Sequence, residues 1–363
     1  MNNKEKKIIF YIDVMKRGGA QRVMSVIVNH LAKTNDNLVL ITDFKSENLA
    51  DEYEINSNVK RLYLRESIKG NAILKNIERI KCLRRIVKSE KPDIILSFLG
   101  RPNIRMLLAT IGLKCKKFVS VRNDPNKEYG TNFIKKLFSK TLFLLADGCV
   151  FQTSDASKYF FKKTQKKSKI IFNPVDEKFY TEYSNTEKKD IISVGRLEPQ
   201  KNHKLLIEAF ENISQEIEEN LLIYGDGNLK EELQKFVNDK RLNDRVLFMG
   251  NVKDIDVVLQ SAKVFVLSSD YEGMPNALME AMATGVGCIS TDCPCGGPKA
   301  LIENDTQGIL VPCGDSIALS NAIQKMLLQY KKYGEAAKQR AKKFKEDKIL
   351  KEWEDYLFNS WKG

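Results

Sequence analysis

Residues 268–285 read SSDYEGMPNALMEAMATG and directly follow the short apolar run 264–267. An apolar run of this length is typical of a buried strand. Pro275 suits the first position of a helix, and Gly285 suits the left-handed residue that ends one. The stretch therefore predicts a strand, a loop and a helix over residues 275–284, which is the repeating unit of an α/β fold.

The same order of strand, loop and helix recurs along the whole chain. It starts at residues 8–14 and starts again at 191–194, after the proline-containing segment 173–176, which we interpret as a linker. Further strands are expected at residues 38–42, 93–98, 117–121, 148–152, 221–224, 246–248, 264–267, 287–290 and 308–311. Such alternation favours parallel sheets covered by helices on both faces. The sequence predicts two doubly wound Rossmann-like domains facing a central cleft, at 1–172 and 173–345, and a helical tail at 346–363 that packs on the body.

The composition excludes several classes of protein. The chain has 363 residues, 42% of them hydrophobic and 29% charged, which is typical of folded domains and not of disordered or fibrous chains. Its apolar stretches are too short to predict a membrane span, and we expect no secretory signal from its first residues. Its seven cysteines stand at irregular positions and are expected to be reduced. We therefore expect a cytoplasmic protein.

The charge is divided unevenly along the chain. Through residue 172, 35 basic residues stand against 16 acidic ones (+19), and the remainder has 25 against 31 (−6), which together make the net +13. A basic half beside an acidic one indicates that one half meets an anionic partner, such as nucleic acid, lipid headgroups or a phosphorylated ligand. A solvated lysine-rich surface is the alternative.

The helix expected at 275–284 begins at a candidate anion site. Its first amides, near Met274, Asn276 and Ala277, and its dipole suit a diphosphate, and Glu272 lies in the loop beside them. Even along a helical path Glu272 and Glu280 would be about 12 Å apart. Paired carboxyls of glycoside hydrolases stand roughly 5 to 9.5 Å apart. These two acids are therefore expected to hold different parts of one long ligand, unless they are merely a loop charge and a solvated helix residue.

Two other loops that follow strands carry candidate ligand groups. The segment 194–202, VGRLEPQKN, places Arg196 and Lys201 where they can neutralise a leaving diphosphate. The segment 224–227, YGDG, leaves room for close approach of the backbone, although a glycine pair after a strand is often only a turn.

The order and spacing of these motifs resemble the retaining GT-B glycosyltransferases of family 4. The motifs that carry the resemblance are Gly195-Arg196-Leu197 with Lys201-Asn202, Gly225-Asp226-Gly227, Glu272 with Glu280, Gly308-Ile309-Leu310-Val311-Pro312, and the N-terminal Gly18-Gly19-Ala20-Gln21-Arg22. Within that family the chain is most similar to bacterial enzymes that build glycans on a polyprenyl diphosphate, including N-acetylgalactosaminyltransferases.

The resemblance implies transfer of a hexose or N-acetylhexosamine from a nucleotide sugar, expected to be UDP-linked, to a polyprenyl-diphosphate-linked or oligosaccharide acceptor. Arg196 and Lys201 would bind the diphosphate, Glu280 the ribose and Glu272 the transferred sugar. The rest of the donor site would comprise Gly18, Gly19, Gly225, Asp226, Gly227, Val252, Gly273, Met274, Pro275 and Asn276. The acceptor hydroxyl would attack from the face that the diphosphate leaves, giving retention without a catalytic metal or other cofactor.

The N-terminal half departs from the family pattern at one position of interest. Many relatives carry a histidine near the sugar, whereas the corresponding loop here reads SVRNDP over residues 120–125. Asn123, with Arg122 beside it, is the candidate contact to the acceptor or the sugar. An asparagine can form hydrogen bonds but cannot act as a titrating base.

Three other interpretations fit the sequence less well. Asp254 and Asp256 invite a metal site, but an aspartate at the start of a helix more commonly caps it, and no metal is expected. Nucleic-acid binding would fit the basic half, yet no reader motif or aromatic platform is present. A dinucleotide oxidoreductase would need a third glycine in the first loop.

Residues 132–145 mix lysines with large apolar residues, as an interfacial helix on the inner face of the cytoplasmic membrane would. A core helix whose lysines reach the solvent is the open alternative.

Overall fold

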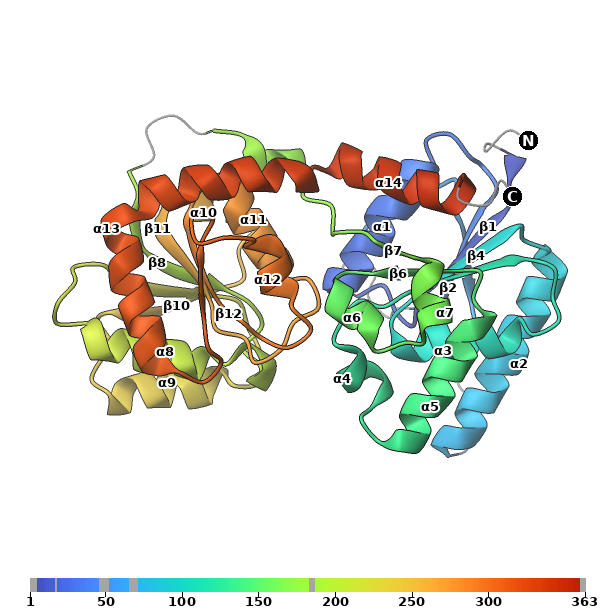
Figure 1. The fold of residues 1–363 in the computed structure, drawn as a ribbon, viewed down its shortest axis with the longest axis horizontal. Helices are drawn as coiled ribbons and strands as arrows, with labels where there is room; N and C mark the ends of the chain where they lie inside the picture. The colour runs from blue at the N-terminus through green and yellow to red at the C-terminus, as the bar shows by residue number, and fades with distance from the viewer. Residues whose placement is uncertain (1–4, 17, 46–51, 65–70, 183–186, 360–363) are drawn as a thin grey trace. The chain divides into compact units, whose positions relative to one another are not determined.

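The computed structural model describes residues 5–16, 18–45, 52–64, 71–182 and 187–359. The chain divides into two compact units, one of residues 1–174 together with 347–363, and the other of residues 175–346. It passes from the first unit to the second between Pro174 and Val175, inside the segment expected to be a linker, and returns between Glu346 and Asp347. Each unit is a parallel sheet flanked by helices (Figure 1).

The first unit has a seven-stranded parallel sheet in the order β3-β2-β1-β4-β5-β6-β7. Its strands are β1 (Ile8–Tyr11), β2 (Leu38–Thr42), β3 (Lys60–Tyr63), β4 (Ile94–Phe98), β5 (Lys116–Ser120), β6 (Gly148–Phe151) and β7 (Ser168–Ile170). The central strand β1 is fully buried, so it reads as a continuous apolar run. Its side chains alternate: Ile8 and Phe10 join the core with Val23 and Met24 of α1 (Gly19–Leu31), whereas Tyr11 faces Arg105 of α3 (Gly100–Ala109).

The C-terminal helix α14 (Glu346–Phe358) completes the core of the first unit. The ring of Trp353 lies 5.6 Å from that of Phe98, and the Tyr356 hydroxyl donates to the Lys167 carbonyl oxygen at 2.6 Å. The remaining helices of this unit are α2 (Ala72–Glu90), α4 (Pro125–Tyr129), α5 (Phe133–Leu142), α6 (Ser154–Lys158) and α7 (Lys162–Lys166). The C-terminal segment of the chain is thus part of the fold of the first unit.

The second unit has a six-stranded parallel sheet in the order β10-β9-β8-β11-β12-β13. Its strands are β8 (Lys189–Val194), β9 (Leu221–Tyr224), β10 (Val246–Gly250), β11 (Ala262–Leu267), β12 (Gly287–Thr291) and β13 (Ile309–Val311). Its helices are α8 (His203–Ile213), α9 (Lys230–Asp239), α10 (Ile255–Gln260), α11 (Asn276–Thr284), α12 (Gly297–Leu301) and α13 (Ser316–Ala341). The strand order reverses between β8 and β11, and in open α/β sheets ligands commonly bind at such a reversal, beyond the carboxyl ends of the strands.

The predicted α/β class and strand pattern are confirmed, with local corrections. Strands β3 and β7 were not predicted, because both are short edge strands in which at least half of the residues are polar. Helix α11 begins at Asn276, and Pro275 stands just before it. Asp254 precedes α10, but the predicted side-chain cap is wrong: its ψ of 55° is not the extended cap conformation, and its backbone carbonyl instead accepts from Val257.

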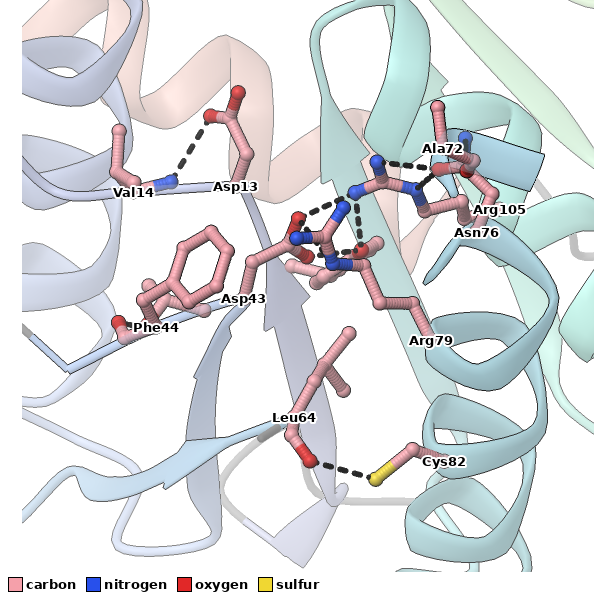
Figure 2. Close-up of polar contacts among 12 residues, drawn as sticks. Asp13, Val14, Asp43, Phe44, Leu64, Ala72, Asn76, Arg79, Cys82 and Arg105 are labelled. Carbon is pink, nitrogen blue, oxygen red and sulfur yellow. Dashed lines mark hydrogen bonds and ion pairs between the residues drawn. The ribbon is translucent and has the colours of Figure 1, made fainter. Parts of the chain in front are cut away.

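A buried polar network joins α2 and α3 to the carboxyl ends of β1 and β2 (Figure 2). Asp43 accepts a hydrogen bond from the Tyr11 hydroxyl at 2.7 Å, and its other oxygen lies 2.5 Å from Nη1 of Arg105. Nε of Arg79 lies 3.4 Å from the same carboxyl, and Arg105 also donates to the Asn76 side chain. Burial, followed by the charge of Asp43, raises the pKa of Tyr11, so this phenol stays neutral and donates. One carboxylate therefore contacts two nearly buried guanidinium groups and offsets part of their charge.

Replacing Asp43 with alanine should lower the free energy of unfolding by about 3 to 5 kcal/mol, because the change leaves two buried cations without their counter-charge. Urea denaturation measures the loss. Asp36→Ala is the matched control, since Asp36 is exposed, and it should change stability by less than about 0.5 kcal/mol. Equal effects of the two substitutions would contradict this account of the network.

Candidate active site

The β8–α8 and β11–α11 loops are fastened together at the point where the strand order reverses. The amide of Asp270 donates to the Gln200 carbonyl oxygen at 2.9 Å, and the Gln200 side chain donates to the Tyr271 carbonyl oxygen at 2.8 Å. The side chain of Asn202 donates to Asp270 at 2.8 Å and also caps the first turn of α8. Two loops about 70 residues apart in sequence thus form one platform.

Lys201 and Glu272 face each other on this platform. The ammonium nitrogen of Lys201 lies 2.6 Å from Oε1 of Glu272, and the Ser269 hydroxyl donates to the same oxygen at 2.9 Å. The two charged side chains are only 16% and 9% exposed. A Cβ at Gly195 would lie 3.3 Å from the Lys201 side chain, so the glycine leaves room for the lysine stem. The carboxylate and the cation are therefore held in a fixed geometry, and the ammonium keeps further N–H donors for a ligand.

The glycines of the YGDG motif allow direct contact between two loop backbones. Gly225 has φ +136°, and a Cβ there would lie 1.9 Å from the Gly195 carbonyl oxygen. A Cβ at Gly227 would lie 2.5 Å from the Leu197 carbonyl oxygen. Both positions exclude any side chain, because backbone atoms cannot give way as a flexible side chain can. The motif thus sets the course of the loop that carries Arg196 and Lys201.

The two cations predicted to bind a diphosphate have different partners in the structure. Arg196 is 63% exposed and pairs with Glu198 at 2.8 Å, whereas Lys201 pairs with Glu272. Asp226, also exposed, accepts from the Gly227 amide and lies 3.9 Å from Lys230. Lys201 and Glu272 are therefore brought together, whereas Arg196 lies on the same loop with its side chain exposed to solvent.

The other predicted donor contacts lie around the start of α11 and after β10. Helix α11 begins without a side-chain cap, and the dipole of a helix favours negative charge at this end. Met274 and Glu280 are buried, and Gly273 is in contact with the backbone of Gly297. Val252 is 41% exposed in the loop that follows β10. Asn276 is the first residue of α11.

Sequence reasoning missed two groups beside Lys201. Ser269 orients the Glu272 carboxyl, although it stands within the quoted motif 268–285. His203, the first residue of α8, is buried, and its Nδ1 has no hydrogen-bond partner among the described residues. Burial, and next the charge of Lys201, lower the pKa of His203 to about 4. The ring is therefore neutral at physiological pH and adds no second charge beside Lys201.

The predicted N-terminal residues lie in the first unit. Gly18 has φ −169°, an extended conformation open to any residue, and Gly19 begins α1. Arg122 is buried and donates to Ser120 and Asn173, while the Asn123 side chain accepts from the Asp124 amide.

A hollow of about 910 Å³ in the second unit lies away from these loops. Its lining includes Lys189, Asn220 and Lys263, at the amino ends of β8, β9 and β11, whereas the candidate site is at the carboxyl ends. In the part of the chain that the structure describes, no cluster of three or more histidine, cysteine or acidic side chains could hold a metal ion.

Comparison with known families identifies the chain. The model "Glycosyl transferases group 1" matches residues 175–344, and the model "Glycosyltransferase Family 4" matches residues 17–179. A Campylobacter jejuni α-1,4-N-acetyl-D-galactosaminyltransferase acting on GalNAc-GalNAc-diNAcBac-PP-undecaprenol is 30% identical over 96% of this chain and 97% of its own. The chain belongs to the family 4 glycosyltransferases.

Two further similarities agree with this assignment. A second C. jejuni enzyme, N-acetylgalactosamine-N,N'-diacetylbacillosaminyl-diphospho-undecaprenol 4-alpha-N-acetylgalactosaminyltransferase, is 28% identical over 97% of this glycosyltransferase and 99% of its own chain. The crystal structure of Anabaena HepE in complex with UDP-glucose superposes with a TM-score of 0.80 at 16% identity, covering 97% of this chain and 99% of that one. The fold class is therefore GT-B, as the sequence predicted.

Replacing Gly225 with alanine should lower the free energy of unfolding by about 3 kcal/mol or more, because it adds both backbone strain and a clash with Gly195. Gly314→Ala is the matched control: Gly314 also has a positive φ, +74°, but open space around it. It should cost only about 1 to 2 kcal/mol. Chemical denaturation of both variants gives the comparison, and a smaller loss for Gly225 than for Gly314 would refute the close-approach argument.

Proposed function

We propose that this glycosyltransferase moves a hexose or N-acetylhexosamine from a UDP-sugar to a lipid-linked or saccharide acceptor, with retention of the anomeric configuration. The observation that carries the proposal is the Lys201–Glu272 pair, which is largely buried at the reversal of strand order. Glu272 stands four residues before Asn276, where α11 begins without a side-chain cap. The two C. jejuni relatives, named for transfer to undecaprenyl-diphosphate-linked glycans, and HepE, which binds UDP-glucose, support it.

The chemistry follows from the position of the charges. As the glycosidic bond to the diphosphate breaks, negative charge grows on the leaving oxygen, where the Lys201 ammonium and the α11 amides can stabilise it without reorganisation. Glu272 accepts hydrogen bonds from sugar hydroxyls while it holds Lys201 in place. An acceptor hydroxyl that attacks on the face of the departing diphosphate gives retention, and the diphosphate oxygen takes its proton. Arg196 would add charge after it leaves Glu198.

Lys201→Ala should lower kcat roughly 100-fold, because it removes a fixed charge from the leaving group. Glu280→Gln should raise the KM for the donor about tenfold with less effect on kcat, as expected for a charged hydrogen-bond acceptor on the ribose. UDP release from UDP-GalNAc, UDP-GlcNAc, UDP-Gal and UDP-Glc, with a prenyl-diphosphate-linked GalNAc as acceptor, measures both.

Lys240→Ala serves as the control for these variants, since Lys240 pairs with Glu211 on the surface of the second unit. It should leave transfer unchanged. Wild-type rates in Lys201→Ala, Glu280→Gln and Arg196→Ala alike would refute the donor site.

We also propose that the first unit docks on an anionic membrane surface through α5. Phe133, Ile134, Leu137 and Phe138 of this helix are 45–77% exposed, which contradicts the alternative that α5 is a core helix. Basic residues dominate this half of the chain, and headgroups of opposite charge complement them. In the described part of the chain, no helix is long and apolar enough to cross a bilayer. Surface binding would bring the enzyme to a lipid-linked acceptor.

The double substitution Phe133→Asp with Ile134→Asp should abolish flotation with vesicles of phosphatidylglycerol and phosphatidylcholine, because each apolar side chain buried in the interface contributes about 1.5 to 3 kcal/mol. Leu328→Asp is the control, as Leu328 is 85% exposed but lies on α13 of the second unit. Wild-type flotation should weaken with salt. Binding of the wild type to DNA or RNA, with none to vesicles, would instead support the nucleic-acid interpretation.

A further inference from the structure

A buried polar cluster lies at the carboxyl ends of β5, β6 and β7 in the first unit. We call Arg122, Glu128, Gln152 and Asn173 the Arg122 cluster. The Gln152 side chain donates to Oδ1 of Asn173 at 2.8 Å, and Nη2 of Arg122 donates to the same oxygen. The Arg122 guanidinium also lies 4.9 Å from the ring centre of Phe98. The cluster therefore fixes the loop from β5 to α4, which carries Asn123.

Three buried atoms of the Arg122 cluster have no hydrogen-bond partner among the described residues: Nε of Arg122, Oε2 of Glu128 and Oε1 of Gln152. Arg122 and Gln152 are only 7% and 3% exposed. A buried carboxylate beside an unpaired guanidinium N–H would gain a charge-assisted hydrogen bond by turning toward it. Such a bond is not made between Arg122 and Glu128, and this arrangement fits a carboxyl that is not ionised.

The surroundings of Glu128 oppose a negative charge. Burial is the main cause that raises the pKa of Glu128 to about 8, and the charges of Asp124 and Asp13 raise it further. Tyr129 and Arg122 act in the opposite direction. Helix α3 faces Glu128 with uncharged Gly100, where a Cβ would lie 3.1 Å from the Cβ of Glu128. Burial likewise lowers the pKa of Arg122 to about 9.

We propose that Glu128 is a positioning residue for sugar transfer that works in its protonated form, by leaving Arg122 bound to Asn173 so that the loop with Asn123 keeps its place. This inference rests on the proposed transferase function. An ionised Glu128 would compete for the Arg122 guanidinium and draw it away from Asn173. The loop would then move, and binding of a sugar hydroxyl beside Asn123 would weaken. That hydroxyl belongs to the acceptor or to the transferred sugar.

The first test follows stability and does not depend on catalysis. Because the pKa of Glu128 is raised above its ordinary value of 4.5, the stability that the protonated group supplies is complete below about 4.5 and is lost as the pH rises to about 8. Glu128→Gln is neutral throughout. The melting temperature of Glu128→Gln, relative to that of the wild type, should therefore rise as the pH increases from 5 to 8. Glu54→Gln, at an exposed glutamate, should show no such trend.

The second test follows transfer between pH 6 and 9.5, with KM measured separately for UDP-GalNAc and for the prenyl-diphosphate-linked acceptor. Wild-type activity should fall about tenfold per pH unit above about 8, as expected for loss of one proton. Glu128→Gln should keep its activity within about twofold between pH 7 and 9. A rise confined to the acceptor KM assigns the hydroxyl to the acceptor, and a rise in the donor KM assigns it to the transferred sugar.

Each outcome decides the matter. A melting-temperature difference that does not change with pH would overturn the proposal, since it would mean that Glu128 is ionised in the native protein. A pH trend in stability with the same alkaline loss of activity in Glu128→Gln would overturn the positioning role. Absence of transfer by the wild type at every pH would refute the proposed function and with it the role of Glu128 in transfer, while the melting series would still report the proton.

Discussion

The architecture of the second unit depends on the direct contact of two backbones, at Gly225 and Gly195. Because no side chain fits between them, the loop after β8 follows a single course, and the Lys201 stem lies over Gly195. That course brings the ammonium within 2.6 Å of Glu272, which comes from a different strand. A residue with no side chain thus determines where the charge of another is placed, and the proposed donor site depends on that contact.

The strands of the second unit, and the loops that carry the candidate site, could be predicted because their signals are local. Fully buried parallel strands read as apolar runs, and the loops after β8, β9 and β11 carry glycine, proline and charge at fixed spacing. The exact partner of each charge could not be predicted. Arg196 and Lys201 are five residues apart on one loop, yet one pairs with Glu198 and the other with Glu272, because burial of Lys201 depends on a loop that is distant in sequence.

In the first unit, the main polar contacts could not be predicted from the sequence. Asp43, Arg79 and Arg105 come from three different parts of the chain, and their spacing in the sequence does not indicate that they share one buried network. Glu128 looks like any glutamate on a short helix until the fold places Arg122, Asp124 and Asp13 around it. The strand β7 is three residues long, and the end of the chain joins this unit through Trp353 and Tyr356. These features arise from tertiary packing and produce no periodic pattern in the amino-acid sequence.

The two units stabilise buried charged side chains in different ways. In the second, a cation is held beside a carboxylate and keeps spare donors, which suits a site where negative charge must appear during reaction. In the first, Asp43 lies between two arginines and offsets part of their charge, and the proposed protonated carboxyl of Glu128 lies near a third arginine. The Lys201 ammonium has three N–H donors, of which Glu272 accepts one, and Nε of Arg122 has no hydrogen-bond partner among the described residues, so both retain hydrogen-bonding capacity. The proposed transfer would use that capacity at Lys201 for a diphosphate and near Arg122 for a sugar hydroxyl.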